Sequence, residues 1–333
     1  MRVAVDAMGG DLAPAEVVKG ALTVAAERPS VEFVLVGDEP AISAELAANG
    51  GKPANIVIRH TAEVIAMDDH PAQALRKKRG SSLFLSGEMV KSGEADATFS
   101  AGNTGAAMAI ATFEIGRIPG IDRPAIGASM PHINGRFLLL DAGANVDSKV
   151  EHLEQFAIVG SIYAQRVMGV ENPRVGLLNI GGEEGKGNEL AKEAYGRLAK
   201  CGVNFVGNVE GKEAYEGAAD VIVCDGFAGN VFLKASEGVA EMVVDFLKGQ
   251  LGAVEPSAQQ VLLPVLGKLK QKIDWAETGG APLLGVNGVS IIGHGRSKAK
   301  AMASGIRHAV HAAESGYVSA IREALLNLHG IDR

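Results

Sequence analysis

Six short loops rich in Gly, Asn and Asp carry the residue types that could do chemistry. Each follows an apolar run that is typical of a buried strand. Ligands in open α/β sheets bind beyond the carboxyl ends of such strands, where backbone N–H groups and helix N-termini attract anions. One loop of this kind is more often a plain turn, but six with the same chemistry predict a common binding cleft. The six are DAMGGDLAP (6–14), SAGNTG (100–105), DAGANVD (141–147), NIGGEEGKGN (179–188), CDGFAGN (224–230) and GHGRS (293–297).

None of these loops fits a common nucleotide or metal motif. No G-x-G-x-x-G follows the first strand, and the GKG around Lys186 lacks the first glycine and the Ser or Thr of a P-loop. The histidines lack metal-ligand spacing, so we predict no metal and no cofactor. No G-x-S-x-G elbow is present, and Cys224 is interpreted as a small core residue. A cleft of amides, carboxylates and one or two cations suits orthophosphate, which is itself a nucleophile.

The bulk composition excludes several classes of protein. Of the 333 residues, 47% are hydrophobic and 21% are charged, which is ordinary for a globular enzyme. The formal net charge of -7 argues against a nucleic-acid-binding protein, because phosphate backbones bind basic surfaces. Two cysteines suit a reducing cytoplasm, and neither a signal-peptide pattern nor a membrane-spanning apolar run is present. We expect a cytoplasmic protein with no nucleic-acid partner.

Apolar strands alternate with helical stretches along the whole chain. This alternation is typical of a mostly parallel sheet covered on both faces. With no linker or internal repeat, it predicts one α/β domain over residues 1–333, in which two lobes share a cleft. Strands are expected near 2–7, 31–37, 55–60, 95–100, 125–130, 137–142, 174–180, 203–208, 219–225 and 288–293. Helices are expected near 14–27, 71–92, 105–115, 150–168, 187–200, 229–251, 257–272 and 297–328.

The six loops together resemble those of one known family. With PAQALRKKRGSS (71–82) and GGAPLLGVNGVSIIGHG (279–295), they are similar to the motifs of the bacterial phosphate acyltransferases, also called acyl-ACP:phosphate transacylases. The similarity runs from Ala4 to about Tyr317 with the motifs in the family's order. DAMGGD and SAGNTG together are highly specific for the family.

This resemblance implies a reaction, a fold and partners. Family members transfer a fatty acyl group from acyl carrier protein to orthophosphate. A membrane glycerol-3-phosphate acyltransferase then uses the acyl phosphate in phospholipid synthesis. The implied fold is the three-layer α/β/α type shared with phosphotransacetylase and isopropylmalate dehydrogenase. A homodimer and a peripheral association with the inner face of the cell membrane are implied as well.

Four residues are the candidates for catalysis. Lys186, between two glycines, is the best cation for phosphate or for a developing oxyanion, and Asn230 is a candidate oxyanion donor. Asn103 could grip phosphate or merely cap a helix. His294 could protonate the departing pantetheine thiolate, since an ordinary imidazole has a pKa of about 6.5, or it could be structural.

A second group of residues is expected to bind phosphate or to orient the groups that do. Glycines permit close approach of the backbone, whereas carboxylates would orient donors because they repel a phosphate directly. Glu184 could orient Lys186 or simply be exposed. Gly182 and Gly185 stand where the family carries other residues, which leaves the rest of that loop in place. The group is Asp6, Gly9, Gly10, Asp11, Gly102, Thr104, Gly105, Glu184, Gly187, Asn188 and Asp225.

Two further segments could contact partners. The basic run RKKR, on a predicted helix, is either a solvated face or a docking patch for the acidic carrier protein. Apolar residues at helical spacing over about 236–275, broken near Gly252 and Pro256, predict a helical hairpin for dimer or membrane contact. The basic run comprises Arg76, Lys77, Lys78 and Arg79.

Three other functions stay open at this point. A phosphotransacetylase that acts on short-chain acyl-CoA would share the fold. A metal- and NAD-dependent decarboxylating dehydrogenase is disfavoured because its metal carboxylate pattern is missing. A non-enzymatic scaffold for lipid synthesis would bind vesicles without turnover.

Overall fold

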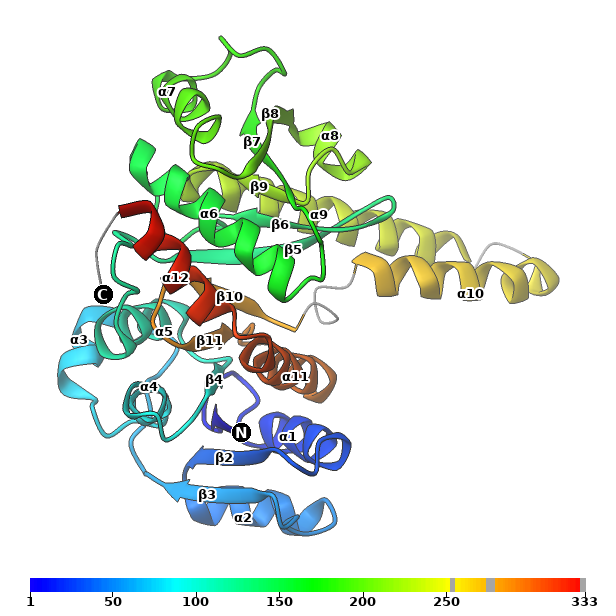
Figure 1. The fold of residues 1–333 in the computed structure, drawn as a ribbon. Coiled ribbons are helices and arrows are strands. Elements are labelled where there is room, and N and C mark those ends of the chain that lie inside the picture. The colour runs from blue at the N-terminus through cyan, green and yellow to red at the C-terminus, as the bar shows by residue number, and fades with distance from the viewer. Residues whose placement is uncertain (252–254, 274–278, 330–333) are drawn as a thin grey trace.

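The computed structural model describes residues 1–251, 255–273 and 279–329. It contains one 11-stranded sheet with helices on both faces (Figure 1). The strands are β1 (Arg2–Asp6), β2 (Glu32–Gly37), β3 (Ile56–His60), β4 (Ala97–Ser100), β5 (Ala125–His132), β6 (Gly135–Leu140), β7 (Arg174–Asn179), β8 (Asn204–Glu210), β9 (Val221–Val223), β10 (Ala281–Leu284) and β11 (Val289–Ile292). The helices are α1 (Ala15–Glu27), α2 (Glu39–Ala48), α3 (Pro71–Lys77), α4 (Ser82–Ser92), α5 (Thr104–Ile110), the π-helix η1 (Ala111–Ile115), α6 (Val150–Arg166), α7 (Glu189–Leu198), α8 (Gly211–Glu216), α9 (Gly226–Leu251), α10 (Pro256–Ile273), α11 (Ala299–Ser315) and α12 (Tyr317–His329).

The sheet consists of two groups of parallel strands that run in opposite directions. Its order is β3-β2-β1-β4-β11-β10-β5-β6-β9-β7-β8. Strand β10 is antiparallel to both β11 and β5, and β5 is antiparallel to β6, so three reversals separate the groups. The loops after β1, β4 and β11 therefore lie at one edge of the sheet, meaning the side that is formed by strand ends. The loops after β6, β7 and β9 lie at the opposite edge. The six loops therefore do not all lie at the same edge, as they would in a wholly parallel sheet. The sequence could not show this, because an apolar strand pattern carries no information on strand direction.

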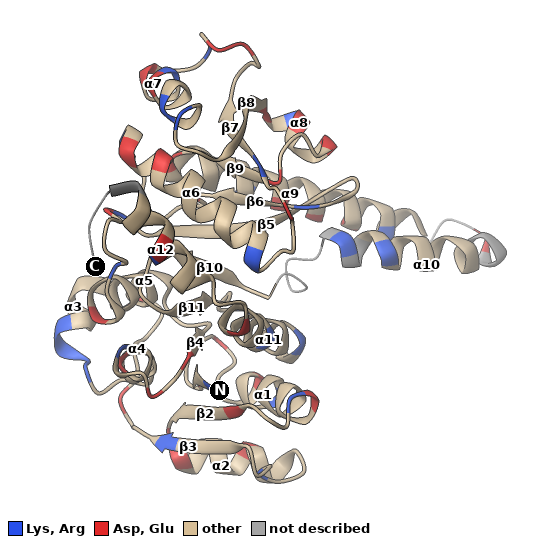
Figure 2. Cartoon of the chain, viewed as in Figure 1, with Lys and Arg blue, Asp and Glu red and all other residues tan. Residues whose placement is uncertain are grey.

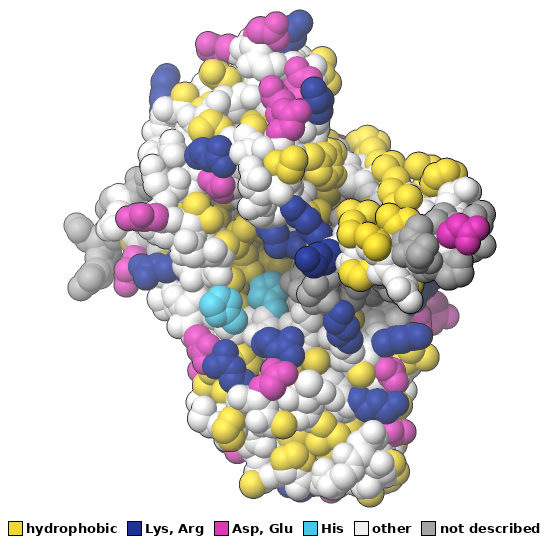
Figure 3. Space-filling model, turned by 90° about the vertical axis from the view of Figure 1, so that its right-hand side faces the viewer, with side chains coloured by type: hydrophobic (Ala, Val, Ile, Leu, Met, Phe, Trp, Pro, Cys, Tyr) yellow, Lys and Arg dark blue, Asp and Glu magenta, His cyan; other side chains and the backbone are white. Residues whose placement is uncertain are grey.

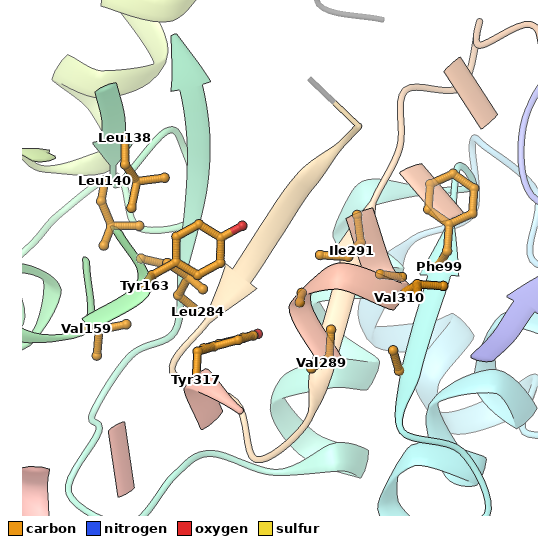
Figure 4. Packing of buried hydrophobic residues seen from close by; sticks show 14 of the residues in the cluster. Phe99, Leu138, Leu140, Val159, Tyr163, Leu284, Val289, Ile291, Val310 and Tyr317 are labelled. Carbon is orange, nitrogen blue, oxygen red and sulfur yellow. The ribbon is translucent and has the colours of Figure 1, made fainter. Parts of the chain in front are cut away.

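Helices cover both faces of the sheet. On the first face α1, α2, α6, α7, α11 and α12 pack into one buried cluster that spans both groups of strands. Figure 4 shows this cluster passing from Phe99 on β4, past Leu284 on β10, to Leu140 on β6. The second face is covered in two parts, by α3, α4 and α5 on one half and by α8 and α9 on the other. A cavity of about 1080 Å³ is lined from both parts.

The cavity borders a place where two strands part. Strands β10 and β5 are in register at only two residue pairs, both near the start of β5. Pro282 on β10 and Pro131 on β5 lie beyond these pairs, and proline has no N–H to donate. Among the residues that the structure describes, 128–132 of β5 pair only with β6, and they line the cavity.

The structure confirms the three-layer, mostly parallel α/β class and corrects several boundaries. The helix expected over 71–92 is two helices, because Ser81 Oγ accepts the Phe84 N–H at 3.4 Å and caps α4. The helix expected over 297–328 breaks at Gly316, whose φ is 66°. Helices α2 and α8 and strand β10 are missing from the expectations. Each is short or buries few apolar side chains, so its periodicity is weak.

Helices α9 and α10 lie where the hairpin is expected and project together from the sheet (Figure 1). The expected break at Gly252 falls outside the described residues. Large apolar side chains of both helices are exposed, including Met242 at 63%, Phe246 at 65% and Val261 at 69%. None of the helices in the described ranges is long and apolar enough to cross a membrane.

Candidate active site

The loops after β1 and β4 meet over a buried carboxylate. Asp6 is 2% exposed, and its Oδ2 accepts a hydrogen bond from Ser100 Oγ at 2.6 Å. Its Oδ1 accepts the Met8 N–H at 3.2 Å. Burial raises the pKa of Asp6, and these hydrogen bonds oppose the rise. Since Ser100 Oγ also accepts the Gly102 N–H at 3.1 Å, Asp6 orients both loops rather than facing a ligand.

Gly9 lies so close to these groups that no side chain fits. A Cβ added there would be 2.6 Å from Asp6 Oδ2, 2.8 Å from the Gly102 nitrogen and 2.9 Å from Ser100 Oγ. At Gly102 the closest such contact is 3.2 Å, to Ser100 Oγ. The two predicted glycines therefore let the loops approach each other, which holds the backbone of both in place.

The loop after β11 completes this edge. The Asp11 N–H donates to the Gly295 carbonyl at 2.8 Å. Gly10, whose φ is 111°, lets the backbone turn just before Asp11. His294 is exposed on the same loop, and its Nδ1 accepts the Arg296 N–H at 3.4 Å. The predicted first, second and last loops are thus brought together.

The Asn103 side chain fixes the start of α5. Its Oδ1 accepts the Ala106 N–H at 3.0 Å, as an N-cap does. Its Nδ2 donates to the carbonyls of Ala66, Met67 and Asp69 at 3.2, 3.0 and 2.9 Å. Asn103 therefore positions Thr104, which is exposed next to it, and ties α5 to the loop that precedes α3.

A second buried carboxylate organises the loop after β6. Asp141 is 0% exposed and accepts N–H groups from Gly143 at 3.1 Å, Ala144 at 2.9 Å and Asn145 at 2.7 Å. Its Oδ1 also accepts the Ile126 N–H at 3.1 Å. Burial raises the pKa of Asp141, and the hydrogen bonds act against that.

The start of α9 packs onto this loop. Asp225 Oδ1 accepts the Ala228 N–H at 2.8 Å and so caps the helix, which makes Asp225 a positioning residue. A Cβ at Gly226 would lie 2.5 Å from the Asn145 carbonyl oxygen, so only glycine allows this approach. Asn230 follows one turn later, exposed, and the loop glycine Gly143 lies against its side chain.

The two assemblies face one cavity, although they come from opposite edges of the sheet. Thr104, Asn230 and His294 all line it, together with Gly143 and Gly295. Figure 3 shows histidine and basic side chains gathered in a hollow between the two halves of the molecule. Three predicted site residues are therefore brought together, and they supply a hydroxyl, an amide and an imidazole.

Lys186 lies elsewhere in this chain. Its loop follows β7, which is at the far end of the sheet from β1, β4 and β11, and Lys186 and Glu184 are exposed there. Neither lines the cavity, and the Lys186 amine has no hydrogen bond or ion pair within the described ranges. Gly187, with a φ of 94°, makes the turn, and Asn188 Oδ1 caps α7 by accepting the Ala191 N–H at 2.9 Å. The assigned role of Lys186 stays a prediction.

The other predicted residues have local structural roles. Gly105 fits against α3, because a Cβ there would be 2.6 Å from Pro71 Cγ. The basic run straddles the end of α3 at Lys77 instead of lying on one helix (Figure 2). Lys78 pairs with Asp69, and Arg79 lies over the Phe84 ring at 5.7 Å. Arg76 and Lys77 are exposed and make no such contact with the residues that the structure describes.

Sequence reasoning missed several residues of the site. Asp141 was inside a quoted loop, but the donors that converge on its carboxylate become visible only in three dimensions. Arg136 lines the cavity from β6, where its guanidinium donates to Ser129 Oγ at 2.8 Å and to the Ser129 carbonyl at 2.7 Å. A charged residue within the apolar run GRFLLL was the available signal.

Comparisons with known sequences agree with the resemblance. A family model described as "Fatty acid synthesis protein" matches residues 1–320. A phosphate acyltransferase from Desulforamulus reducens is 49% identical over 100% of this chain and 99% of that protein. One from Desulfitobacterium hafniense is 51% identical over 98% of each. The family predicted from the loops is confirmed.

Solved structures share the fold at low identity. A phosphotransacetylase from Streptococcus pyogenes superposes with a TM-score of 0.65 at 18% identity, covering 95% of this chain and 94% of that one. A 4-hydroxythreonine-4-phosphate dehydrogenase from Burkholderia phymatum gives a TM-score of 0.51 at 16% identity, covering 93% and 98%. These similarities establish the fold alone.

Proposed function

The chain belongs to the fatty acid synthesis protein family, and we propose that it transfers a long-chain acyl group from acyl carrier protein to orthophosphate. The product, acyl phosphate, would serve phospholipid synthesis through a membrane glycerol-3-phosphate acyltransferase. The observation that carries the proposal is the cavity, where the polar loops of two sheet edges meet an apolar wall. Relatives named phosphate acyltransferase over the whole chain support it.

Thr104, Asn230 and His294 would each have a task in this reaction. The Thr104 hydroxyl and the glycine-rich loops would hold phosphate, whose oxygen attacks the thioester carbonyl. The Asn230 amide would donate to the oxyanion that forms. The new C–O bond replaces the C–S bond, and the pantetheine sulfur leaves as a thiolate that His294 can protonate.

The structure argues against a covalent acyl-enzyme on Cys224. Cys224 is 3% exposed, and burial raises the pKa of its thiol well above the usual value. A protonated thiol is a poor nucleophile. Its Sγ donates to the Asp141 carbonyl at 3.6 Å, so it packs beneath the loop instead of facing the cavity.

Trapping the product with hydroxylamine tests the proposal. Purified protein, palmitoyl-acyl carrier protein and phosphate should give hydroxamate that depends on phosphate. Asn230→Ala should lower the rate, whereas Gly182→Ala, where an added Cβ meets nothing within 4 Å, should not. No phosphate-dependent hydroxamate would refute the proposal. A phosphotransacetylase acting on short-chain acyl-CoA, the alternative that the fold favours, would show faster turnover of acetyl-CoA.

Carrier-protein docking would use the exposed cations of the basic run. We expect the charge reversals Arg76→Glu and Lys77→Glu to raise KM for palmitoyl-acyl carrier protein and not for palmitoyl-CoA. The effect should fade at high salt, because exposed charges are screened. Lys200→Glu, the reversal of a lysine that is also exposed but lies on the opposite half, is the control. Equal effects on both donors would exclude docking at this run.

The hairpin would mediate homodimer formation or membrane contact through its exposed apolar side chains. Sedimentation of the protein with Phe246→Asp should show loss of the dimer if the hairpin is the interface. Flotation with anionic vesicles should show loss of binding if it contacts the bilayer. A variant that keeps both properties would exclude the hairpin from either role.

A further inference from the structure

The cavity is larger and more apolar than phosphate and a thioester require. Its volume of about 1080 Å³ is at the upper end of small-molecule sites. One wall is formed by β5, where Ile126, Ala128 and Met130 point to the face that α9 covers. Phe232 and Leu233 of α9 also line the cavity and pack against the same apolar cluster. These side chains offer a hydrocarbon-binding surface that adjoins the polar groups of the site.

Helix α9 places the polar and apolar parts in a line. Asn230, Leu233, Glu237 and Ala240 all line the cavity, and their spacing of three or four residues puts them on one side of the helix. At 1.5 Å per residue, Leu233 lies about 4.5 Å and Ala240 about 15 Å along the axis from Asn230. This row of four side chains therefore begins at Asn230, the candidate oxyanion donor, and extends away from it along the helix.

The charges on this stretch are paired. Lys234 Nζ donates to Glu237 Oε2 at 2.7 Å, one turn along the helix. Tyr215, opposite, donates its hydroxyl to Ser236, so this polar group too has a partner. Paired groups let a hydrocarbon chain pass without leaving an isolated charge beside it.

We propose that the acyl chain of the donor lies along α9 in this cavity, from Asn230 toward Ala240, and that this length limits the acyl chains accepted. The inference rests on the proposed acyl transfer and adds where the chain lies. The tail would pass between the β5 wall and α9 while the carbonyl stays beside Asn230. Each methylene buried there would improve KM by up to about fourfold, the equivalent of ~0.8 kcal/mol.

Substitutions that narrow the cavity at two depths test this placement. Leu233→Trp should confine turnover to short acyl groups, because it narrows the cavity about one helical turn from Asn230. Ala240→Trp should abolish turnover of only the donors with the longest acyl chains. Val231→Trp is the matched control, since Val231 is 53% exposed on the same helix and does not line the cavity. The assay is hydroxamate formation with butyryl-, octanoyl-, dodecanoyl- and palmitoyl-acyl carrier protein.

The expected result is an ordered shift in chain-length preference. The palmitoyl-to-butyryl rate ratio should fall at least about tenfold in both variants, and the octanoyl-to-butyryl ratio only in Leu233→Trp. Melting temperatures near that of the wild type would show that the variants fold. An unchanged length profile in both, or a cut-off in the reverse order, would overturn the placement. If the wild type turns over none of these donors, the proposed function itself fails.

Discussion

The contact between the first two loops predicts a graded series of glycine-to-alanine variants. In Gly9→Ala the new methyl group would meet three polar atoms at 2.6 to 2.9 Å. One is Asp6 Oδ2, and the other two are Ser100 Oγ at the end of β4 and the Gly102 nitrogen in the loop that follows. Overpacking of this kind costs about 1–3 kcal/mol. If the strain is relieved by moving the loops, phosphate KM should rise about fivefold to 150-fold, at 1.36 kcal/mol per factor of ten.

Two further variants calibrate this effect. Gly102→Ala, with a closest contact of 3.2 Å, should raise phosphate KM less than Gly9→Ala does. Gly182→Ala has open space and should behave like the wild type. Phosphate KM and melting temperature would be measured for all three. A Gly9→Ala enzyme with wild-type phosphate KM would refute the reasoning that these loops hold phosphate, as would equal effects at Gly9 and Gly182.

Three other predictions concern residues that position the site. Asn103→Ala should destabilise the protein by about 1–3 kcal/mol and raise phosphate KM, because it removes a helix cap and the amide that donates to three carbonyls; an unchanged urea midpoint would contradict this. Asp141→Ala should cost at least about 3 kcal/mol in urea denaturation, and Asp141→Asn less, because several N–H groups lose their acceptor. Burial lowers the pKa of His308, whose ring bonds the Tyr163 hydroxyl and the Gly279 carbonyl. As the pH falls, the His308 imidazole is therefore protonated in the unfolded chain before it is protonated in the folded chain. The free energy of unfolding falls as the pH drops below about 6.5. His308→Gln should flatten the melting temperature between pH 7.5 and 5.5, and an equally steep decline would contradict the assignment.

Much of the first half of the site is predictable from residue types alone. Gly9, Gly10 and Gly102 stand at strand ends, where close backbone approach needs glycine, and the structure shows that approach. Residue type alone allows Asn103 to be a phosphate ligand or a helix cap; in the structure its Oδ1 caps α5 and its Nδ2 donates to three carbonyls of residues 66–69. The Nδ2 bonds could not be predicted, because the loop at 66–69 is distant in sequence and carries no recognisable motif.

The relative direction of the two strand groups is what the sequence could not reveal. It depends on β10, a four-residue strand that no periodicity indicates, and on two further reversals around β5. These reversals put the loop of Lys186 far from Thr104 within one chain, while α9 still brings Asn230 to the cavity. The role of Asp141 could not be predicted either, because the N–H groups that donate to its carboxylate come together only after folding.

In the proposed reaction orthophosphate is the acyl acceptor, and one of its own oxygens forms the new bond to the acyl carbonyl. The most direct measurement follows phosphate labelled with ¹⁸O at every oxygen, in the presence of palmitoyl-acyl carrier protein, by ³¹P NMR. The product should be palmitoyl phosphate that retains all of the ¹⁸O label, formed at the rate at which the carrier thiol is released. Thiol release without labelled acyl phosphate would contradict it.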